Sequence, residues 1–170
     1  MSTTPECQYW VDAESNPALL ILNGRASYLN CGPVGRFFDK LIRDTESDII
    51  IDFKGCTGMD STFLGLIAGA AIELRKQTPP RSLTLCRLNE RNLELIRNLG
   101  LHRILTVDAQ DHDLSFDANK AAELSDEQKE KVATARTILQ AHENLIQADA
   151  ANQEKFQDVL TFLKMQVDNE

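Results

Sequence analysis

The most restrictive feature of this 170-residue chain is a short β-branched run at residues 49–53, Ile-Ile-Ile-Asp-Phe. A nearly continuous apolar run of this kind is typical of a strand that is buried on both faces, as strands of parallel sheets are. Stretches in which apolar residues recur at helical spacing precede and follow it. The run therefore predicts a sheet covered by helices, which is an α/β fold.

Strand and helix patterns alternate along the first two-thirds of the chain. Strands are predicted at residues 9–11, 19–22, 49–53, 83–88 and 104–107. Helices are predicted at residues 34–42, from near Ser61 to a stop at Pro79-Pro80, and at 90–99. Asn89 suits the N-cap of the last of these helices and Gly100 suits its C′ position. Gly55 and Gly58 predict a short loop between the central strand and the helix that starts near Ser61.

The last third has a different pattern, so we predict a domain at 1–114 and a helical extension at 115–170. Ser125–Gln128 reads as a capping box, Ser-Asp-Glu-Gln. Two apolar stripes follow, one formed by Val132, Ala135, Ile138, Leu139, Leu145 and Ile146, and the other by Phe156, Val159, Leu160, Leu163 and Val167. They predict a helical hairpin, which cannot be stable at this length unless its stripes are covered. The hairpin is either a flap over the sheet or over a helix face, or a docking and dimerisation element.

Composition excludes several functions. The net charge of −8 disfavours nucleic acid and anionic membrane surfaces as partners. The first ten residues have neither a basic nor an apolar leader pattern, and no apolar run could span a bilayer, so we expect a cytoplasmic protein.

The four cysteines lie far apart and are expected to be buried thiols. The three histidines, His102, His112 and His142, have no metal-site spacing, so we expect neither metal nor cofactor, and we expect His142 to be packed or solvated.

The segment GMDSTFLGL, residues 58–66, places Asp60, Ser61 and Thr62 between the buried strand and the following helix. Side chains of this kind commonly cap a helix. A hydroxyl at a helix N-terminus is also accessible to a kinase. A phosphate there adds roughly −1.5 to −2 charge units, which the helix dipole tolerates. A partner docked on the neutral hydroxyl would instead meet repulsion and buried charge. The segment is therefore either a cap or a switch.

Several motifs together resemble the STAS domain, the anti-sigma factor antagonist family. They are the strand IIIDF, the loop KGCTGM, the DST that opens a helix containing LGL, the earlier ILNGRA, and the later RLNERNLELIRNLGLHRIL. The resemblance covers about residues 8–110. It implies a STAS-like mixed sheet flanked by helices, to which this chain adds the C-terminal hairpin.

The resemblance also implies a function. In this family the serine after the aspartate is phosphorylated by a serine kinase that doubles as an anti-sigma factor, and only the unphosphorylated protein binds that kinase. Ser61 would be the phosphoacceptor and Thr62 a second candidate. Asp60, Ser61, Thr62 and Phe63 would form the partner-binding surface. The kinase and a phosphatase would be the partners. Independently of the resemblance, the apolar stripes of the hairpin offer a surface for self-association.

Two departures from the family pattern concern the same surface. Phe63 stands where members commonly carry glycine, and Gly24-Arg25-Ala26-Ser27 lacks an aspartate that many members have. Phe63 is either an apolar anchor for the partner or a side chain packed inward or under the hairpin. The kinase therefore cannot be identified from the motif.

Two other functions compete with the switch. Catalysis is disfavoured because Ser61 lacks a G-x-S-x-G context and the glycine loop lacks the lysine of a phosphate-binding P-loop. We therefore predict that the protein is not an enzyme. The alternative within the family is a scaffold subunit of a stress-sensing or lipid-transport assembly, in which the serine need not be phosphorylated.

Overall fold

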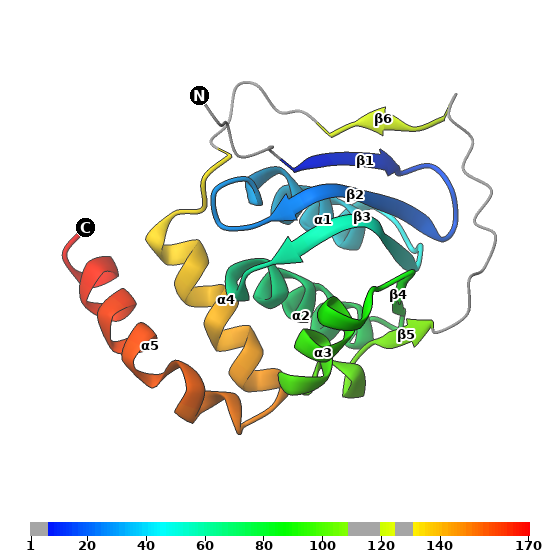
Figure 1. Ribbon diagram of the computed structural model, residues 1–170. Helices are drawn as coiled ribbons and strands as arrows, with labels where there is room; N and C mark the ends of the chain where they lie inside the picture. Colours follow the sequence, from blue (N-terminus) through cyan, green and yellow to red (C-terminus); the bar gives the residue numbers. More distant parts are fainter. Residues whose placement is uncertain (1–6, 109–119, 125–130) are drawn as a thin grey trace.

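The structure is a computed structural model that describes residues 7–108, 120–124 and 131–170. Within these ranges six strands form one mixed sheet in the order β5-β4-β3-β2-β1-β6 (Figure 1). The strands are β1 (Gln8–Asp12), β2 (Ala18–Ala26), β3 (Ile49–Met59), β4 (Leu83–Cys86), β5 (Thr106–Asp108) and β6 (Ala122–Glu123). From β2 to β5 all neighbours are parallel, whereas β1 pairs antiparallel with both β2 and β6. The predicted α/β fold with a mixed sheet is confirmed.

Five α-helices and one 3₁₀ helix accompany the sheet in the described ranges. They are α1 (Gly32–Asp44), α2 (Ser61–Arg75), α3 (Glu90–Asn98), η1 (Leu101–Arg103), α4 (Ala135–Ala148) and α5 (Asn152–Asp168). The two C-terminal helices form the predicted hairpin. Figure 1 shows α4 running beside α2, with α5 on the outer side of α4 at the edge of the molecule.

One face of the sheet carries the core. Its alternate side chains are fully or almost fully buried together with those of α1 and α2: Leu20, Leu22, Ile49, Ile51, Phe53, Leu83, Leu85, Phe38, Leu64 and Ile67. On the other face Trp10, Leu19, Ile21 and Ile50 are only partly buried. The expectation that residues 49–53 are buried on both faces therefore applies fully to one face only.

The segment predicted as a glycine loop is part of a strand. β3 continues through Gly55 and Gly58 to Met59 and stays paired with β2, with register shifts after Ile21 and Gly24. A Cβ on Gly55 would lie 2.9 Å from the Leu22 carbonyl oxygen, so glycine permits the close approach of the two backbones. The long strand delivers the chain directly to the start of α2.

Three other boundaries differ from the predictions. Leu88 follows the end of β4, and Ile104 and Leu105 precede β5, because η1 and its turn occupy this part of the chain. Val132 is half-exposed and lies before α4, whose N-cap is Thr134; the Thr134 hydroxyl accepts the Thr137 amide at 3.1 Å. The capping box predicted at 125–128 lies outside the described residues.

Several predicted helix boundaries are confirmed. Asn89 caps α3 by accepting the Asn92 amide at 2.7 Å, and Gly100 follows that helix with a left-handed φ of 72°. The helix α2 ends at Arg75, before Pro79. All four cysteines are free and buried, as predicted.

Candidate functional site

Asp60 fixes the start of α2. It is the N-cap, and its Oδ1 accepts the Phe63 amide at 2.9 Å. Its Oδ2 accepts the Tyr28 amide, from the loop after β2, at 2.8 Å. Charge-assisted bonds to two amides are among the stronger hydrogen bonds in proteins. Asp60 therefore caps the helix and joins it to the neighbouring loop, which leaves the Ser61 hydroxyl unused for capping.

The Ser61 hydroxyl instead contacts a histidine of the C-terminal hairpin. Ser61 Oγ lies 2.9 Å from His142 Nε2, and His142 Nδ1 lies 2.7 Å from the Ile138 carbonyl oxygen. A carbonyl can only accept, so Nδ1 carries a proton and donates it to Ile138. In the neutral ring Nε2 is then the acceptor, and the Ser61 hydroxyl donates to it.

The imidazole of His142 is enclosed between two helices. His142 is only 3% exposed, and its ring packs edge-on against Phe156 of α5, with ring centroids 5.1 Å apart. Ser61 itself is partly exposed. Of the two placements expected for His142, packed or solvated, the structure has the packed one; its partner, Ser61, was not foreseen.

The helix α4 approaches α2 closely because α2 has glycines on the facing side. A Cβ on Gly65 would lie 2.7 Å from Ala141 Cα, closer than side chains come to such atoms, and one on Gly69 would lie 3.1 Å from Asn144 Cγ. Asn144 Nδ2 donates to the Gly65 carbonyl oxygen at 3.1 Å, and Gln140 Nε2 donates to Asn144 Oδ1 at 2.9 Å. Small residues therefore let the two backbones meet, and amide side chains fix their register.

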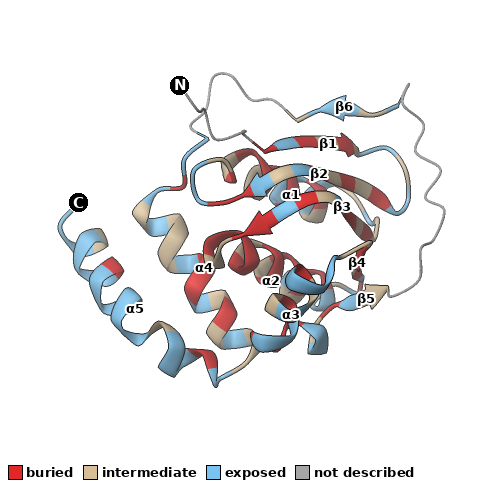
Figure 2. Ribbon diagram, viewed as in Figure 1, coloured by how far each residue is buried: buried red, intermediate tan, exposed pale blue. Residues whose placement is uncertain are grey.

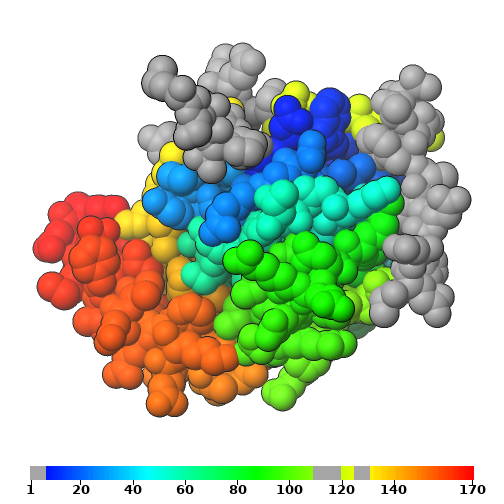
Figure 3. Space-filling view, viewed as in Figure 1, coloured from blue at the N-terminus to red at the C-terminus, as the bar shows by residue number. Residues whose placement is uncertain are grey.

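The turn between α4 and α5 is attached to the end of α3. Asn152 is fully buried, and its Nδ2 donates to the carbonyl oxygens of Leu99 at 2.9 Å and Leu145 at 2.7 Å. Lys155 Nζ donates to the Asn98 carbonyl oxygen at 2.6 Å. Figure 3 shows the result as a continuous surface between the orange residues of the hairpin and the green residues of α3.

The remaining residues of the predicted partner surface point inward. Phe63 is 0% exposed and stacks on Tyr9, with ring centroids 6.3 Å apart and planes inclined by 13°. Of the two placements left open for Phe63, the structure has the inward one. Thr62 is 4% exposed. Within the Asp-Ser-Thr-Phe segment, only Asp60 and Ser61 are partly exposed.

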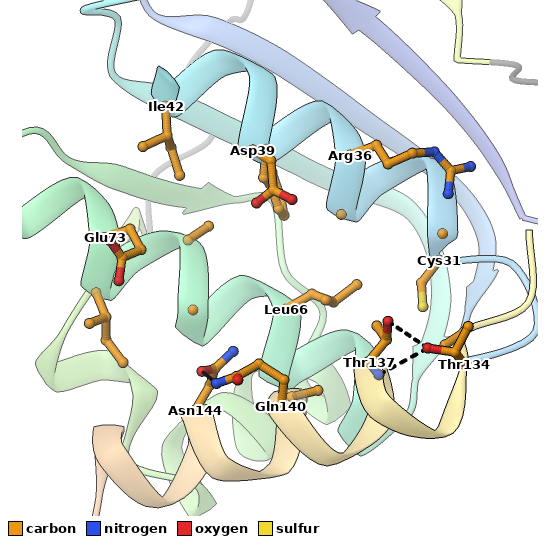
Figure 4. Close-up of a pocket in the computed structure, with 18 of the residues that line it drawn as sticks. Cys31, Arg36, Asp39, Ile42, Leu66, Glu73, Thr134, Thr137, Gln140 and Asn144 are labelled. Atoms are coloured by element: carbon orange, nitrogen blue, oxygen red, sulfur yellow. Dashed lines mark hydrogen bonds between the residues drawn. The ribbon is translucent and has the colours of Figure 1, made fainter. Parts of the chain in front are cut away.

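A groove of about 580 Å³ lies beside this contact, between α1 and α4 and over α2 (Figure 4). Its lining is mixed, with Leu66 at its floor and Asp39, Glu73 and Gln140 around it. Burial raises the pKa of the Asp39 carboxyl, an effect that nearby Arg43 opposes. Neither Ser61 nor His142 lines the groove.

A scan against protein families matches the STAS domain over residues 11–114. The chain belongs to the STAS domain family. No curated protein matches the chain at a significant level. Among the described residues, no helix has the length and apolar character needed to cross a membrane, and no cluster of three or more His, Cys, Asp or Glu side chains could hold a metal ion.

STAS membership supports a regulatory role through protein–protein contact, as an antagonist of an anti-sigma factor or as a scaffold. The matched residues include Asp60 and Ser61 but end before α4 and α5. The histidine that holds the Ser61 hydroxyl therefore lies outside the matched segment. One sequence signal could have indicated this contact: α2 is apolar almost all round, as helices covered on several sides are.

Proposed function

We propose that this STAS protein is a phosphorylation-switched regulator of the anti-sigma factor antagonist type. It binds an anti-sigma serine kinase in the cytoplasm while Ser61 is unphosphorylated, and phosphorylation of Ser61 releases the kinase. A phosphatase resets the switch. In this proposal the protein is a kinase substrate and has no catalytic activity of its own.

The main support for the proposal is that Asp60, and not Ser61, caps α2. Asp60 makes both the cap and the link to Tyr28, so α2 keeps its start whatever happens to Ser61. The Ser61 hydroxyl stands in the first turn of α2, where free amides and the helix dipole favour an added anion. A phosphate would thus change the surface without removing the cap. A partner seated there would lose affinity through buried, unpaired charge.

Ser61 is favoured over Thr62 as the acceptor because Thr62 is buried. Phosphorylation of Thr62 would require the first turn of α2 to open, since its hydroxyl has no path to a kinase in the closed helix. The pairing of a serine with a histidine also occurs in hydrolytic enzymes. The adjacent groove includes neither residue, so it offers no substrate site at this pair.

Affinity capture from the protein's own cells tests the switch. Tagged wild type, Ser61→Ala and Ser61→Asp are compared, with Thr161→Asp as a control that adds the same charge on the exposed side of α5. We expect a protein with a serine-kinase domain to be retained by wild type, Ser61→Ala and Thr161→Asp, and to be lost with Ser61→Asp. Equal retention by all four would contradict the switch.

The second candidate is a scaffold subunit whose serine is never modified. It is favoured by one observation, the hydrogen bond that already occupies the Ser61 hydroxyl within the chain. A partner complex that persists with Ser61→Asp would select this alternative.

We also propose that α5 is the element for self-association. Its outer side exposes Val159, Phe162 and Met165, with Phe162 59% and Met165 61% exposed (Figure 2). Phe162→Asp would shift the sedimentation coefficient to that of the monomer. If wild type is already monomeric at high concentration, this part of the proposal is wrong.

A further inference from the structure

We propose that α4 is an intramolecular occupant of the surface that carries Ser61, and that it must lift from α2 before a kinase or partner can reach that surface. The chain would thus inhibit its own engagement, and phosphorylation at Ser61 would hold the hairpin open. This inference rests on the proposed function for its biological consequence. Its physical claim concerns only α2 and α4.

The surface in question is the α2 docking face, formed by Ser61, Gly65 and Gly69. Residues four apart lie on the same side of a helix, so the three form one row. The row has a hydroxyl at its start and two positions without a side chain. It therefore fits an α-helix that brings a small residue to the closest point and polar side chains to either side of it.

The helix α4 meets each of these requirements. Ala141 backs onto Gly65, Asn144 reaches the Gly65 carbonyl oxygen, and His142 takes the Ser61 hydroxyl. A second protein that docks a helix on the same row would need the same space. Binding of α4 and binding of such a partner therefore exclude each other.

With Ser61 Oγ directed at His142, the closed contact leaves no room for a phosphate. The site that a phosphoryl group on Ser61 Oγ would enter is held by the His142 ring, 2.9 Å away, which is itself backed by Phe156. The carboxylate of Asp60, one residue before, adds negative charge on the same side of the helix start. Steric overlap with the His142 ring therefore favours departure of α4, whereas the Asp60 charge belongs to α2 and acts equally in the closed and open states.

The helix α4 buries fewer side chains than the helix α1 does, so it is expected to open before the core. In α4 only Ala141, His142 and Leu145 are buried, whereas α1 buries five side chains, including Phe37, Phe38 and Leu41 (Figure 2). Elements with few buried apolar contacts open at lower free energy than the core. The far end of α4 is held to the domain by the Asn152 bond to the Leu99 carbonyl oxygen, and the segment before α4 is held by the bond from the Ala133 amide to the Tyr28 carbonyl oxygen at 2.7 Å. Opening is therefore a local parting of α4 from α2 between these two attachments.

Hydrogen exchange measured by mass spectrometry on the full chain tests the inference. The samples are unmodified protein, protein with phosphoserine incorporated at position 61, and Ser61→Asp. We expect exchange in α4 to accelerate about tenfold or more with phosphoserine, which corresponds to about 1.4 kcal/mol. Exchange in α1 should not change. Unchanged or slower exchange in α4 would overturn the inference, because a phosphate gripped by His142 would tighten the contact.

A second variant opens the contact without adding charge. In Gly65→Ala the new methyl group would overlap the backbone of Ala141, so α4 exchange should accelerate while α1 stays protected. Gly35→Ala is the matched control, since its Cβ would meet Leu66 Cδ2 at an ordinary 3.8 Å. Ser61→Asp could unfold the whole chain, which would be seen as faster exchange in α1 as well. In that case Gly65→Ala is the variant that tests whether α4 opens separately. Full protection of α4 in Gly65→Ala would contradict the inference.

The two proposals can fail independently. The exchange experiment needs no kinase, so an α4 that opens with phosphoserine 61 stands even if cells never phosphorylate the protein. Conversely, Ser61→Asp could abolish kinase binding while α4 remains closed. That result would support the switch and show that the hairpin takes no part in it.

Discussion

His142 contacts Ser61 across 81 positions of the chain, from a helix that lies outside the segment matched to the STAS family. The contact joins the residue proposed for phosphorylation to the element that distinguishes this chain from a minimal STAS domain. Its two hydrogen bonds, to Ser61 and to Ile138, make His142 the polar centre of the interface between α2 and α4.

Replacing His142 with Ala should destabilise the fold by about 1–3 kcal/mol, because the buried ring and both its hydrogen bonds are lost. Urea unfolding followed by circular dichroism measures the change. His102→Ala is the control, since His102 is exposed, and should stay within about 0.5 kcal/mol of wild type. Similar losses in both variants would mean that the His142 contact contributes nothing specific.

Asp60→Ala should be more destabilising than Ser61→Ala. The first removes a cap and a bond to Tyr28, with a loss of about 2 kcal/mol expected. The second removes one hydroxyl bond and should cost about 1 kcal/mol or less. Urea unfolding midpoints of the two variants, compared at an equal dependence of the unfolding free energy on urea concentration, measure the difference. A larger loss for Ser61→Ala would show that Ser61, and not Asp60, secures the start of α2.

Asn152→Asp should be worse than Asn152→Ala. The amide nitrogen that donates to Leu99 and Leu145 becomes an oxygen, which faces two carbonyl oxygens in a buried site. The folded state would therefore raise the pKa of the new carboxyl, so the penalty should grow as pH rises and shrink in acid. Unfolding measured from about pH 4 to about pH 7 checks this trend. Equal penalties for Asp and Ala at neutral pH would contradict the assignment of the Asn152 amide.

Stability should fall as pH rises from about 9 to about 11. Burial raises the pKa of the Cys7, Cys31 and Cys86 thiols to about 11, from their ordinary value of 9.0. The unfolded chain loses these protons first, so their contribution is complete below pH 9 and is lost as pH approaches 11. Unfolding curves at increasing pH measure the slope, which should be shallower in Cys31→Ala. A thiol reagent should react slowly with the folded protein at neutral pH.

Local signals in the sequence predicted much of the fold because they depend on neighbouring residues. The caps at Asn89 and Gly100, the stop before Pro79 and the buried run at 49–53 all act within a few positions. The extension of β3 through Gly55 was missed because its cause is pairing with Asn23 of β2, which is distant in sequence. Likewise η1 displaced the predicted start of β5.

The candidate site divides in the same way. The helix cap before Ser61 follows from the local sequence, whereas the inward placement of Phe63 depends on stacking with Tyr9. The covering of α2 by α4 depends on Gly65 and Gly69, and the sequence predicted the hairpin without indicating which face of the domain it covers. Such long-range contacts leave only indirect traces, here a helix that is apolar on nearly every side.

Mass spectrometry of the protein purified from its own cells, with phosphatase-treated controls, tests the central claim most directly. The peptide that spans residues 58–66 is compared between growth and stress. We expect a phosphate on Ser61 in one of the two conditions and its disappearance after phosphatase treatment. A peptide that carries no phosphate in either condition would contradict the switch and leave the scaffold function in its place.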